Sequence, residues 1–358
     1  FFVISKIKPR LTGSLKMNFS LKLSVSIFLS ALFAINCFSV TLASSKSSSA
    51  VVVVYHRFNE PAFESTSIRL EQFKAHLSEL KKNQYNVVSL PEIVSSVNLG
   101  RDLPDRTIGL SVDDAYRSFY DVAWPLLKEA KMPVTLFVST DVVDRQAPGY
   151  MTWDQIREVQ KEGVIIGSQT KSHKHLPLLS LGDAKMEIDK ANIRIATELG
   201  KKPSLLAYPY GEYSSPVRQI IIDRGFDAAF TQSSGVISSH LDKFALPRFA
   251  LNERYGGIDR FRLIVNAMPM MVTDVLPKDP FLTNNPPAFG FTVDPIVGSL
   301  KRLACFASNQ GKLSLEQLGR RVEVRLASAF PAGRSRINCT MPGLKERWRW
   351  FGVQFTVP

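Results

Sequence analysis

The sequence predicts an α/β fold, a distorted (β/α) barrel followed by a small all-β appendage. Apolar strand-like runs alternate with amphipathic helical segments at least five times between residues 51 and 231, which is typical of a parallel α/β architecture. No Gly-rich nucleotide loop is present, so a barrel is favoured over an open sheet. The 358 residues are enough for one large domain and an appendage.

The elements follow from residue type and spacing. The strand at 51–55 is a continuous β-branched run, and similar apolar runs predict strands at 108–112, 134–138, 164–166, 205–208 and 228–231. Apolar residues at helical spacing predict helices at 69–82, 152–161 and 180–200. Polar clusters follow four of these strands, at the strand ends where chemistry collects in such folds.

The character of the chain changes after residue 270. We expect upstream residues and a signal peptide at 1–43, the barrel domain at 44–270, a Pro/Asn-rich linker at 271–290 and a small β domain at 291–358. Trp348, Trp350, Phe351 and Phe355 alternate with arginines in the last segment. They could stack on sugars, but the core of a β-sandwich is the favoured interpretation.

The amino-terminal segment has the pattern of a secretory signal. From Met17, a basic residue precedes an apolar stretch that ends near Ala43, which predicts an exported, periplasmic or extracellular protein. An uncleaved membrane anchor is the alternative. Cys305 and Cys339 remain after the signal, and in an exported chain they are expected to form a disulfide.

The net charge of +13 includes five basic residues in the expected leader. The remaining excess is spread along the chain, which favours an anionic surface or a polysaccharide as partner, with membrane or cell-wall proximity possible. Nucleic acid is not expected, because no basic cluster forms. The sequence leaves the oligomeric state open.

The chemistry centres on Asp113 and Asp114, two adjacent carboxylates at the end of a buried strand. Burying two neighbouring charges is costly, and a metal ion would offset that cost. Asp114 and His173 are the best ligand candidates, and His175, two residues on, would face the same side in an extended segment. His175 could therefore be a third ligand or a supporting group.

Three segments resemble those of the polysaccharide deacetylases of the NodB-homology type, carbohydrate esterase family 4. They are residues 111–116 (SVDDAY), 166–173 (IGSQTKSH) and 207–212 (AYPYGE), and the resemblance covers roughly residues 50–267 in the right order. The family consists of metal-dependent amidases that remove acetyl groups from N-acetylated glycans. The resemblance implies a divalent metal cofactor, with zinc favoured, and an N-acetylated polysaccharide substrate.

The resemblance also implies roles for individual residues. Asp113 would be the general base, His56 the acid, and the Tyr210 backbone N–H would bind the oxyanion. Asp114, His173, Gln169 and His175 form the expected metal site, in which Gln169 replaces the first histidine ligand of the family. The residues assigned to substrate binding are Tyr208, Pro209 and Arg248.

Two departures from the family pattern leave a second function open. Gln169 is a weaker ligand than imidazole, and the family's Leu-x-His near the end of the domain is missing, with residues 245–248 (ALPR) in that region. We predict an exported metal-dependent deacetylase of a cell-envelope or extracellular glycan. The alternative is a catalytically weakened relative that binds glycan, and a third hypothesis is a scaffold protein. A serine hydrolase is disfavoured, because no Gly-x-Ser-x-Gly elbow occurs.

Overall fold

The computed structural model describes residues 49–358, and the expected signal peptide lies outside this range. Within the described range, no helix is both long and apolar enough to cross a membrane.

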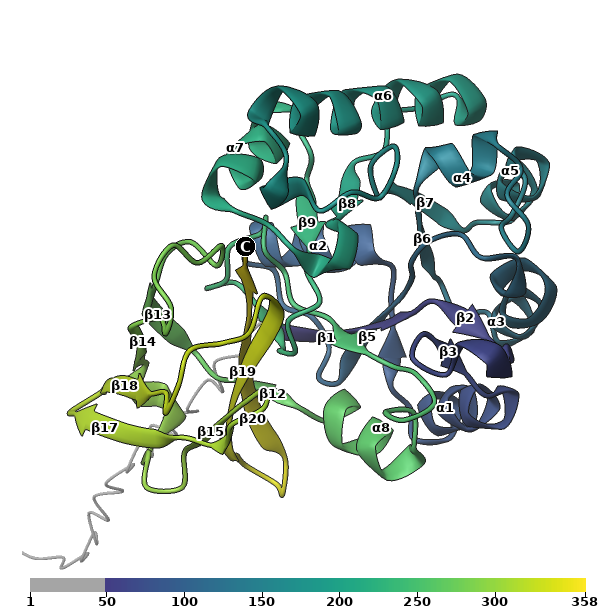
Figure 1. Ribbon diagram of the computed structural model, residues 1–358. Coiled ribbons are helices and arrows are strands. Elements are labelled where there is room, and N and C mark those ends of the chain that lie inside the picture. The colour runs from purple at the N-terminus through teal and green to yellow at the C-terminus, as the bar shows by residue number, and fades with distance from the viewer. Residues whose placement is uncertain (1–48) are drawn as a thin grey trace, which may run out of the picture. The chain divides into compact units, whose positions relative to one another are not determined.

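The larger part of the described chain is a curled, mostly parallel sheet with helices around it (Figure 1). Its main path runs in the order β10-β1-β5-β6-β7-β8-β9, with β4 paired to β5 and β11 paired to β1. Only β10 pairs antiparallel along this path. The strands are β1 (Ser49–Tyr55), β4 (Asn86–Val87), β5 (Thr107–Val112), β6 (Thr135–Val138), β7 (Ile165–Ser168), β8 (Leu205–Ala207), β9 (Ala228–Phe230), β10 (Ile237–Ser238) and β11 (Phe249–Ala250).

The segment from Leu246 to Ala250 links the two sides of this sheet. Leu246 forms a parallel bridge with Phe230 at the end of β9, and β11 pairs in parallel with β1 three residues later. The sheet therefore curls toward closure, as expected for a distorted barrel. The chain between these two contacts crosses the region beneath the strand ends, where Arg248 is fully buried.

Helices cover the outside of the sheet, and several match the sequence prediction closely. The expected helix at 152–161 begins with a capping box in which Thr152 and Gln155 bond each other's backbone. The expected helix at 180–200 is α6, which Gly200 ends with a left-handed backbone. The helices are α1 (Leu70–Lys82), α2 (Leu90–Asn98), α3 (Trp124–Ala130), α4 (Thr140–Asp144), α5 (Trp153–Lys161), α6 (Leu181–Leu199), α7 (Ser215–Asp223) and α8 (Ile258–Val265), and a short parallel pair joins β2 (Arg57–Phe58) to β3 (Ser67–Ile68).

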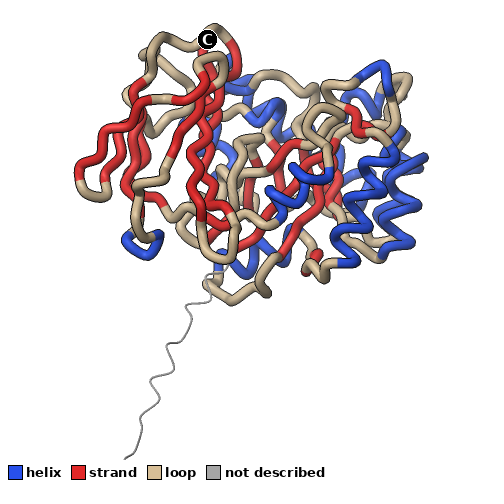
Figure 2. Tube along the Cα trace, turned by 90° about the horizontal axis from the view of Figure 1, so that it is seen from below, coloured by secondary structure: helices blue, strands red, loops and turns tan. Residues whose placement is uncertain are grey.

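The carboxyl-terminal part consists of two mainly antiparallel sheets (Figure 2). One sheet has the order β12-β20-β19-β15-β16 and the other β13-β14-β18-β17. Phe289, Phe291 and Phe355 are buried in their shared core. The strands are β12 (Met268–Pro269), β13 (Val272–Leu276), β14 (Phe289–Val293), β15 (Ala304–Ala307), β16 (Gly311–Lys312), β17 (Ser314–Leu318), β18 (Arg321–Arg325), β19 (Gly333–Pro342) and β20 (Trp348–Val357).

The structure confirms the expected disulfide, because Cys305 and Cys339 lie opposite each other on β15 and β19 and are bonded. The expected linker at 271–290 needs correction. It contributes β13, which pairs with β14, so its beginning and its end belong to one of the carboxyl-terminal sheets. The proline content masked a short strand pattern, VTDVL, at its beginning.

Candidate active site

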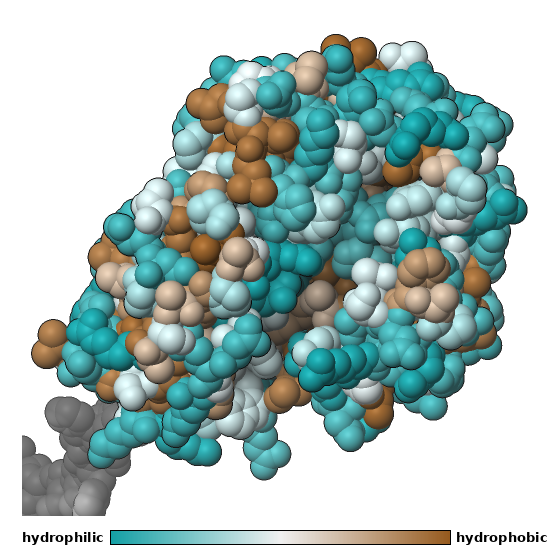
Figure 3. Space-filling view, in the orientation of Figure 1, coloured by the Kyte–Doolittle hydropathy of each residue, from teal (hydrophilic) through white to brown (hydrophobic). Residues whose placement is uncertain are grey.

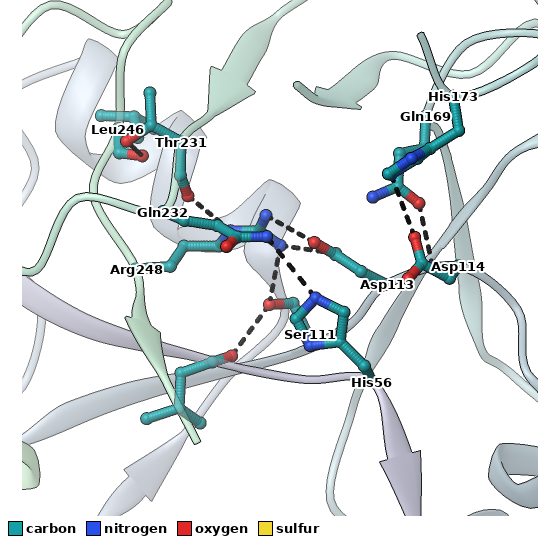
Figure 4. A network of polar contacts seen from close by, with 11 residues as sticks. His56, Ser111, Asp113, Asp114, Gln169, His173, Thr231, Gln232, Leu246 and Arg248 are labelled. Atoms are coloured by element: carbon teal, nitrogen blue, oxygen red, sulfur yellow. Dashed lines mark hydrogen bonds and ion pairs between the residues drawn. The ribbon is translucent and has the colours of Figure 1, made fainter. Parts of the chain in front are cut away.

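A cleft with a volume of about 910 Å³ opens at the carboxyl ends of the parallel strands. One polar side chain of the cleft lining follows each of five strands, and the sequence predicted such a side chain after four of these strands. They are His56 after β1, Asp114 after β5, His173 after β7, Tyr210 after β8 and Gln232 after β9. Figure 4 shows four of these side chains together.

The backbone around the cleft adopts conformations that non-glycine residues rarely take. The φ angles are 74° at Asp114, 53° at Ala115, 68° at Thr170, 55° at His173 and 60° at Tyr210. Such strain persists only where the surrounding structure enforces it, and it concentrates at functional sites. The strained residues belong to the three segments that carry the family resemblance.

Asp114 and His173 face each other across the cleft, with 3.2 Å between Asp114 Oδ1 and His173 Nε2. Burial raises the pKa of the Asp114 carboxyl, but the close contact with His173 and the charges of His56 and His173 together lower it by a larger amount, so the pKa lies below its usual value. Asp114 Oδ1 is buried and has no hydrogen bond of good geometry. A buried carboxylate oxygen in this state can accept a cation.

The two other expected ligands are not in position. Gln169 is fully buried, and its Oε1 accepts a hydrogen bond of 2.9 Å from the Asp114 backbone N–H. Among residues 49–358, no cluster of three or more His, Cys, Asp or Glu side chains could hold a metal ion. Asp114 and His173 thus fit two positions around a divalent cation, whereas a zinc site with three protein ligands does not form.

His175 supports Tyr210 instead of facing Asp114. Its ring stacks on Tyr210 with centroids 3.9 Å apart, and its Nδ1 lies 2.7 Å from Glu212 Oε2. The expectation that His173 and His175 share a side required an extended backbone. The left-handed conformation of His173 removes that alternation, so the prediction of a His175 ligand does not match the structure.

Asp113 forms a fully buried ion pair with Arg248 (Figure 4). Both side chains are fully buried, and the two guanidinium nitrogens donate to the two carboxylate oxygens at 2.7 and 2.8 Å. Arg248 also donates to the backbone carbonyl of Thr231 and to the hydroxyl of Ser111. Arg248 therefore does not reach the cleft, which corrects its assignment to substrate binding.

Tyr208 and Pro209 are buried as well. The Tyr208 hydroxyl donates to the backbone carbonyl of Phe244, so this side chain supports the segment between β10 and β11 and does not line the cleft. His56 does line the cleft, with its Nε2 3.5 Å from the amide nitrogen of Gln232. The expected acid is thus accessible, while the expected base, Asp113, is not exposed.

Sequence reasoning missed two features of the site. The Asp113–Arg248 pair joins residues 135 positions apart, although an unpaired buried Asp was already a signal that a cation must lie nearby. Arg260, Arg334 and Arg336 also line the cleft. Arg334 and Arg336 alternate in β19, so their shared face could have been recognised from the spacing.

Comparison with known proteins agrees with the fold and the motifs. Residues 100–229 match the family model described as polysaccharide deacetylase. The poly-beta-1,6-N-acetyl-D-glucosamine N-deacetylase of Escherichia coli (strain K12) is 24% identical over 244 residues, which cover 55% of this chain and 36% of that protein. The protein of the same name from Staphylococcus aureus (strain MSSA476) is 21% identical, over 58% of this chain and 80% of that protein.

A solved structure shows the same fold. The Streptococcus pyogenes deacetylase PplD in complex with acetate superposes with a TM-score of 0.57 at 20% identity, covering 61% of this chain and 98% of that chain. The chain is therefore similar to the polysaccharide deacetylases over residues 100–229, and it shares the fold of the solved deacetylase structure. It spans about a third of the length of the Escherichia coli relative.

Proposed function

We propose that the protein is an exported, metal-dependent deacetylase that hydrolyses N-acetyl groups of an extracellular or cell-envelope polysaccharide. The observation that carries this proposal is the facing pair of Asp114 and His173 in a cleft at the strand ends. The names of the relatives support N-acetylglucosamine polymers as the substrate class. The disulfide supports an oxidising compartment, in keeping with the expected signal peptide.

Asp114 and His173 would hold the divalent cation, for which zinc is favoured because it accepts a carboxylate and an imidazole. When bound, such a cation polarises an amide carbonyl and lowers the pKa of water. The backbone N–H of Tyr210 would bind the oxyanion, and the stacked His175 holds that residue in place. Water adds to the carbonyl carbon, the C–N bond breaks, and the amine leaves with a proton while acetate is released.

Two residues are proposed for the proton transfers. His56 lines the cleft and is the proposed acid for the leaving amine. Asp113 remains the proposed base, with both of its oxygens bonded to Arg248. A carboxylate has about four lone-pair positions, of which Arg248 uses two, so Asp113 keeps acceptor capacity. Its burial means that water must reach it during the reaction.

A second candidate function is glycan binding without turnover. Two observations favour it, the Gln169 oxygen that already accepts the Asp114 backbone N–H and the bidentate contact that covers Asp113. A weakened relative would keep the cleft but would release no acetate.

The test is acetate release from N-acetylglucosamine hexamers by the purified chain with added zinc. Asp114→Asn and His173→Gln should abolish the release, while His240→Gln, which changes an exposed histidine in the same part of the chain, should leave it unchanged. If the wild type binds the hexamer and releases no acetate with any divalent metal, the deacetylase proposal fails and the binding function replaces it.

A further inference from the structure

The far wall of the cleft belongs to the carboxyl-terminal sheets. Phe306 on β15, Arg334, Arg336 and Asn338 on β19, and Trp350 on β20 line the same cavity as His56 and Asp114. Figure 3 shows the surface hollowed between the two parts of the described chain, with hydrophilic side chains around the hollow. Anything that reaches Asp114 therefore also meets the β domain.

This wall is held firmly against the barrel. Gln354 on β20 donates a hydrogen bond of 3.0 Å to the backbone carbonyl of Tyr210. Trp350 packs edge-on against Phe249 of β11, with centroids 5.1 Å apart, and its indole N–H donates to Asn338. A side chain at Gly352 would overlap the backbone oxygen of Ser234, so β20 lies directly on the loop after β9.

The wall, together with Arg260 on the neighbouring helix α8, carries positive charge without matching acids. Among the described residues, neither Arg260 nor Arg336 has a carboxylate partner, and the Nε of Arg260 is buried without a hydrogen bond. Burial lowers the pKa of both guanidinium groups, and the charge of Arg334 lowers that of Arg336 further. Arg334 is balanced in part by Glu212 at 3.7 Å.

Asp114 is the one carboxylate among the described residues that line the cleft. Half-buried guanidinium groups that repel one another are unfavourable unless an anion pairs with them. The arrangement also does not suit a neutral glycan whose deacetylated product carries an ammonium group, because that product would be repelled. The missing partner is therefore an anion that enters with the substrate.

We propose that Arg260, Arg334 and Arg336 form a subsite for an anionic substituent on the glycan, so that the substrate is an acidic, N-acetylated polysaccharide. Guanidinium groups suit this task because their fork matches the oxygens of a carboxylate, sulfate or phosphate. Trp350, in the same lining, offers an aromatic face for the sugar ring, while the Tyr255 ring lies 5.1 Å from the Arg260 guanidinium. This inference rests on the proposed function and adds the charge class of its substrate.

The experiment compares the binding of three hexasaccharide probes to the full chain by calorimetry at low salt. They are a neutral N-acetylglucosamine hexamer, the same hexamer with 6-O-sulfate groups, and a hyaluronan hexasaccharide, in which N-acetylglucosamine alternates with glucuronate. At least one anionic probe should bind about tenfold more tightly than the neutral one, because each charge-assisted contact has that magnitude. A preference for the sulfated probe indicates an ester, and a preference for hyaluronan indicates a ring carboxylate.

Arg336→Gln and Arg260→Gln should each remove most of this preference, whereas Arg302→Gln, an exposed arginine in the same β domain, should not. Arg334→Gln is a more exposed variant of the same subsite in case the others fold poorly. Equal affinities for neutral and anionic probes would overturn the inference, and so would an equal loss with Arg302→Gln. Acetate release is measured in parallel: its absence with all probes rejects the deacetylase function, while the binding preference still tests the subsite.

Discussion

Asp113 and Asp114 are neighbours in the chain, yet their surroundings differ completely. Asp113 points into the sheet, where Arg248 bonds both of its oxygens and neither side chain meets solvent. Asp114 points into the cleft toward His173 and keeps one buried oxygen without a good hydrogen bond. This comparison indicates that the Asp113 carboxylate stabilises the fold, whereas the Asp114 carboxylate is available to bind a ligand.

The largest expected effect comes from breaking the fully buried ion pair between Asp113 and Arg248. Arg248→Met leaves the charge of Asp113 buried without a partner and should lower the free energy of unfolding by about 3–5 kcal/mol. The double variant Asp113→Leu/Arg248→Met should recover much of this loss. Urea denaturation measures both. Arg117→Met, which breaks an exposed pair with Asp121, should cost less than about 1 kcal/mol. Similar losses for Arg117→Met and Arg248→Met would contradict the comparison.

His76 is a second buried titratable side chain, and it is not part of the cleft lining. Its Nε2 bonds the carbonyl of Gly256 and its Nδ1 contacts the hydroxyl of Tyr55, while burial lowers its pKa to about 4. The unfolded chain therefore binds more protons between pH 6.5 and 4, and stability falls as the pH drops through this window.

The contribution of His76 to this loss is at most about 3 kcal/mol. Denaturation midpoints across the window should fall less steeply for His76→Gln than for the wild type. His240→Gln, at an exposed position, should follow the wild-type slope. Parallel slopes for His76→Gln and the wild type would show that His76 does not stay neutral in the folded state.

Replacing Asp114, whose carboxylate faces the cleft, should affect activity far more than stability, which is the opposite of the effect expected at the buried Asp113–Arg248 pair. Asp114→Asn should reduce acetate release at least about a hundredfold, because it removes the charge that faces His173. Its free energy of unfolding should fall by much less than that of Arg248→Met, because the amide keeps the size of the carboxylate and only the favourable interactions of the charge with His56 and His173 are lost. Initial rates and urea denaturation of the same preparation show both. A large loss of stability would mean that Asp114 is structural.

The smallest expected effect concerns Gln169. Gln169→His restores an imidazole beside Asp114 and should raise zinc affinity about tenfold or more, measured by calorimetry. Gln232→His, on the other side of the cleft, is the control and should leave the affinity unchanged. An unchanged affinity for Gln169→His would mean that the buried Gln169 position cannot reach the cation.

Much of the fold was predictable because its signals are local. The β-branched run of β1, the capping box of α5 and Gly200 after α6 each report on their own backbone. The disulfide was predictable because the third cysteine falls in the expected leader, which leaves Cys305 and Cys339 as a pair.

The site was predictable only in part, because its decisive contacts are not local. Asp114 and His173 were recognised by type, and the structure brings them together. The partner of Asp113 lies far along the chain, and the position of His175 depends on a left-handed backbone at His173 that no residue type announces. The β domain looked like an appendage, since only the folded chain places its arginines in the cleft.

The most direct test of the account is the zinc content of the purified protein after equilibrium dialysis, with Asp113→Asn and Asp114→Asn beside the wild type. The account predicts about one equivalent in the wild type and in Asp113→Asn, and its loss in Asp114→Asn. Zinc that is retained by Asp114→Asn, or acetate release by a wild type that binds no divalent metal, would contradict the assignment of Asp114 as the open, ligand-binding carboxylate.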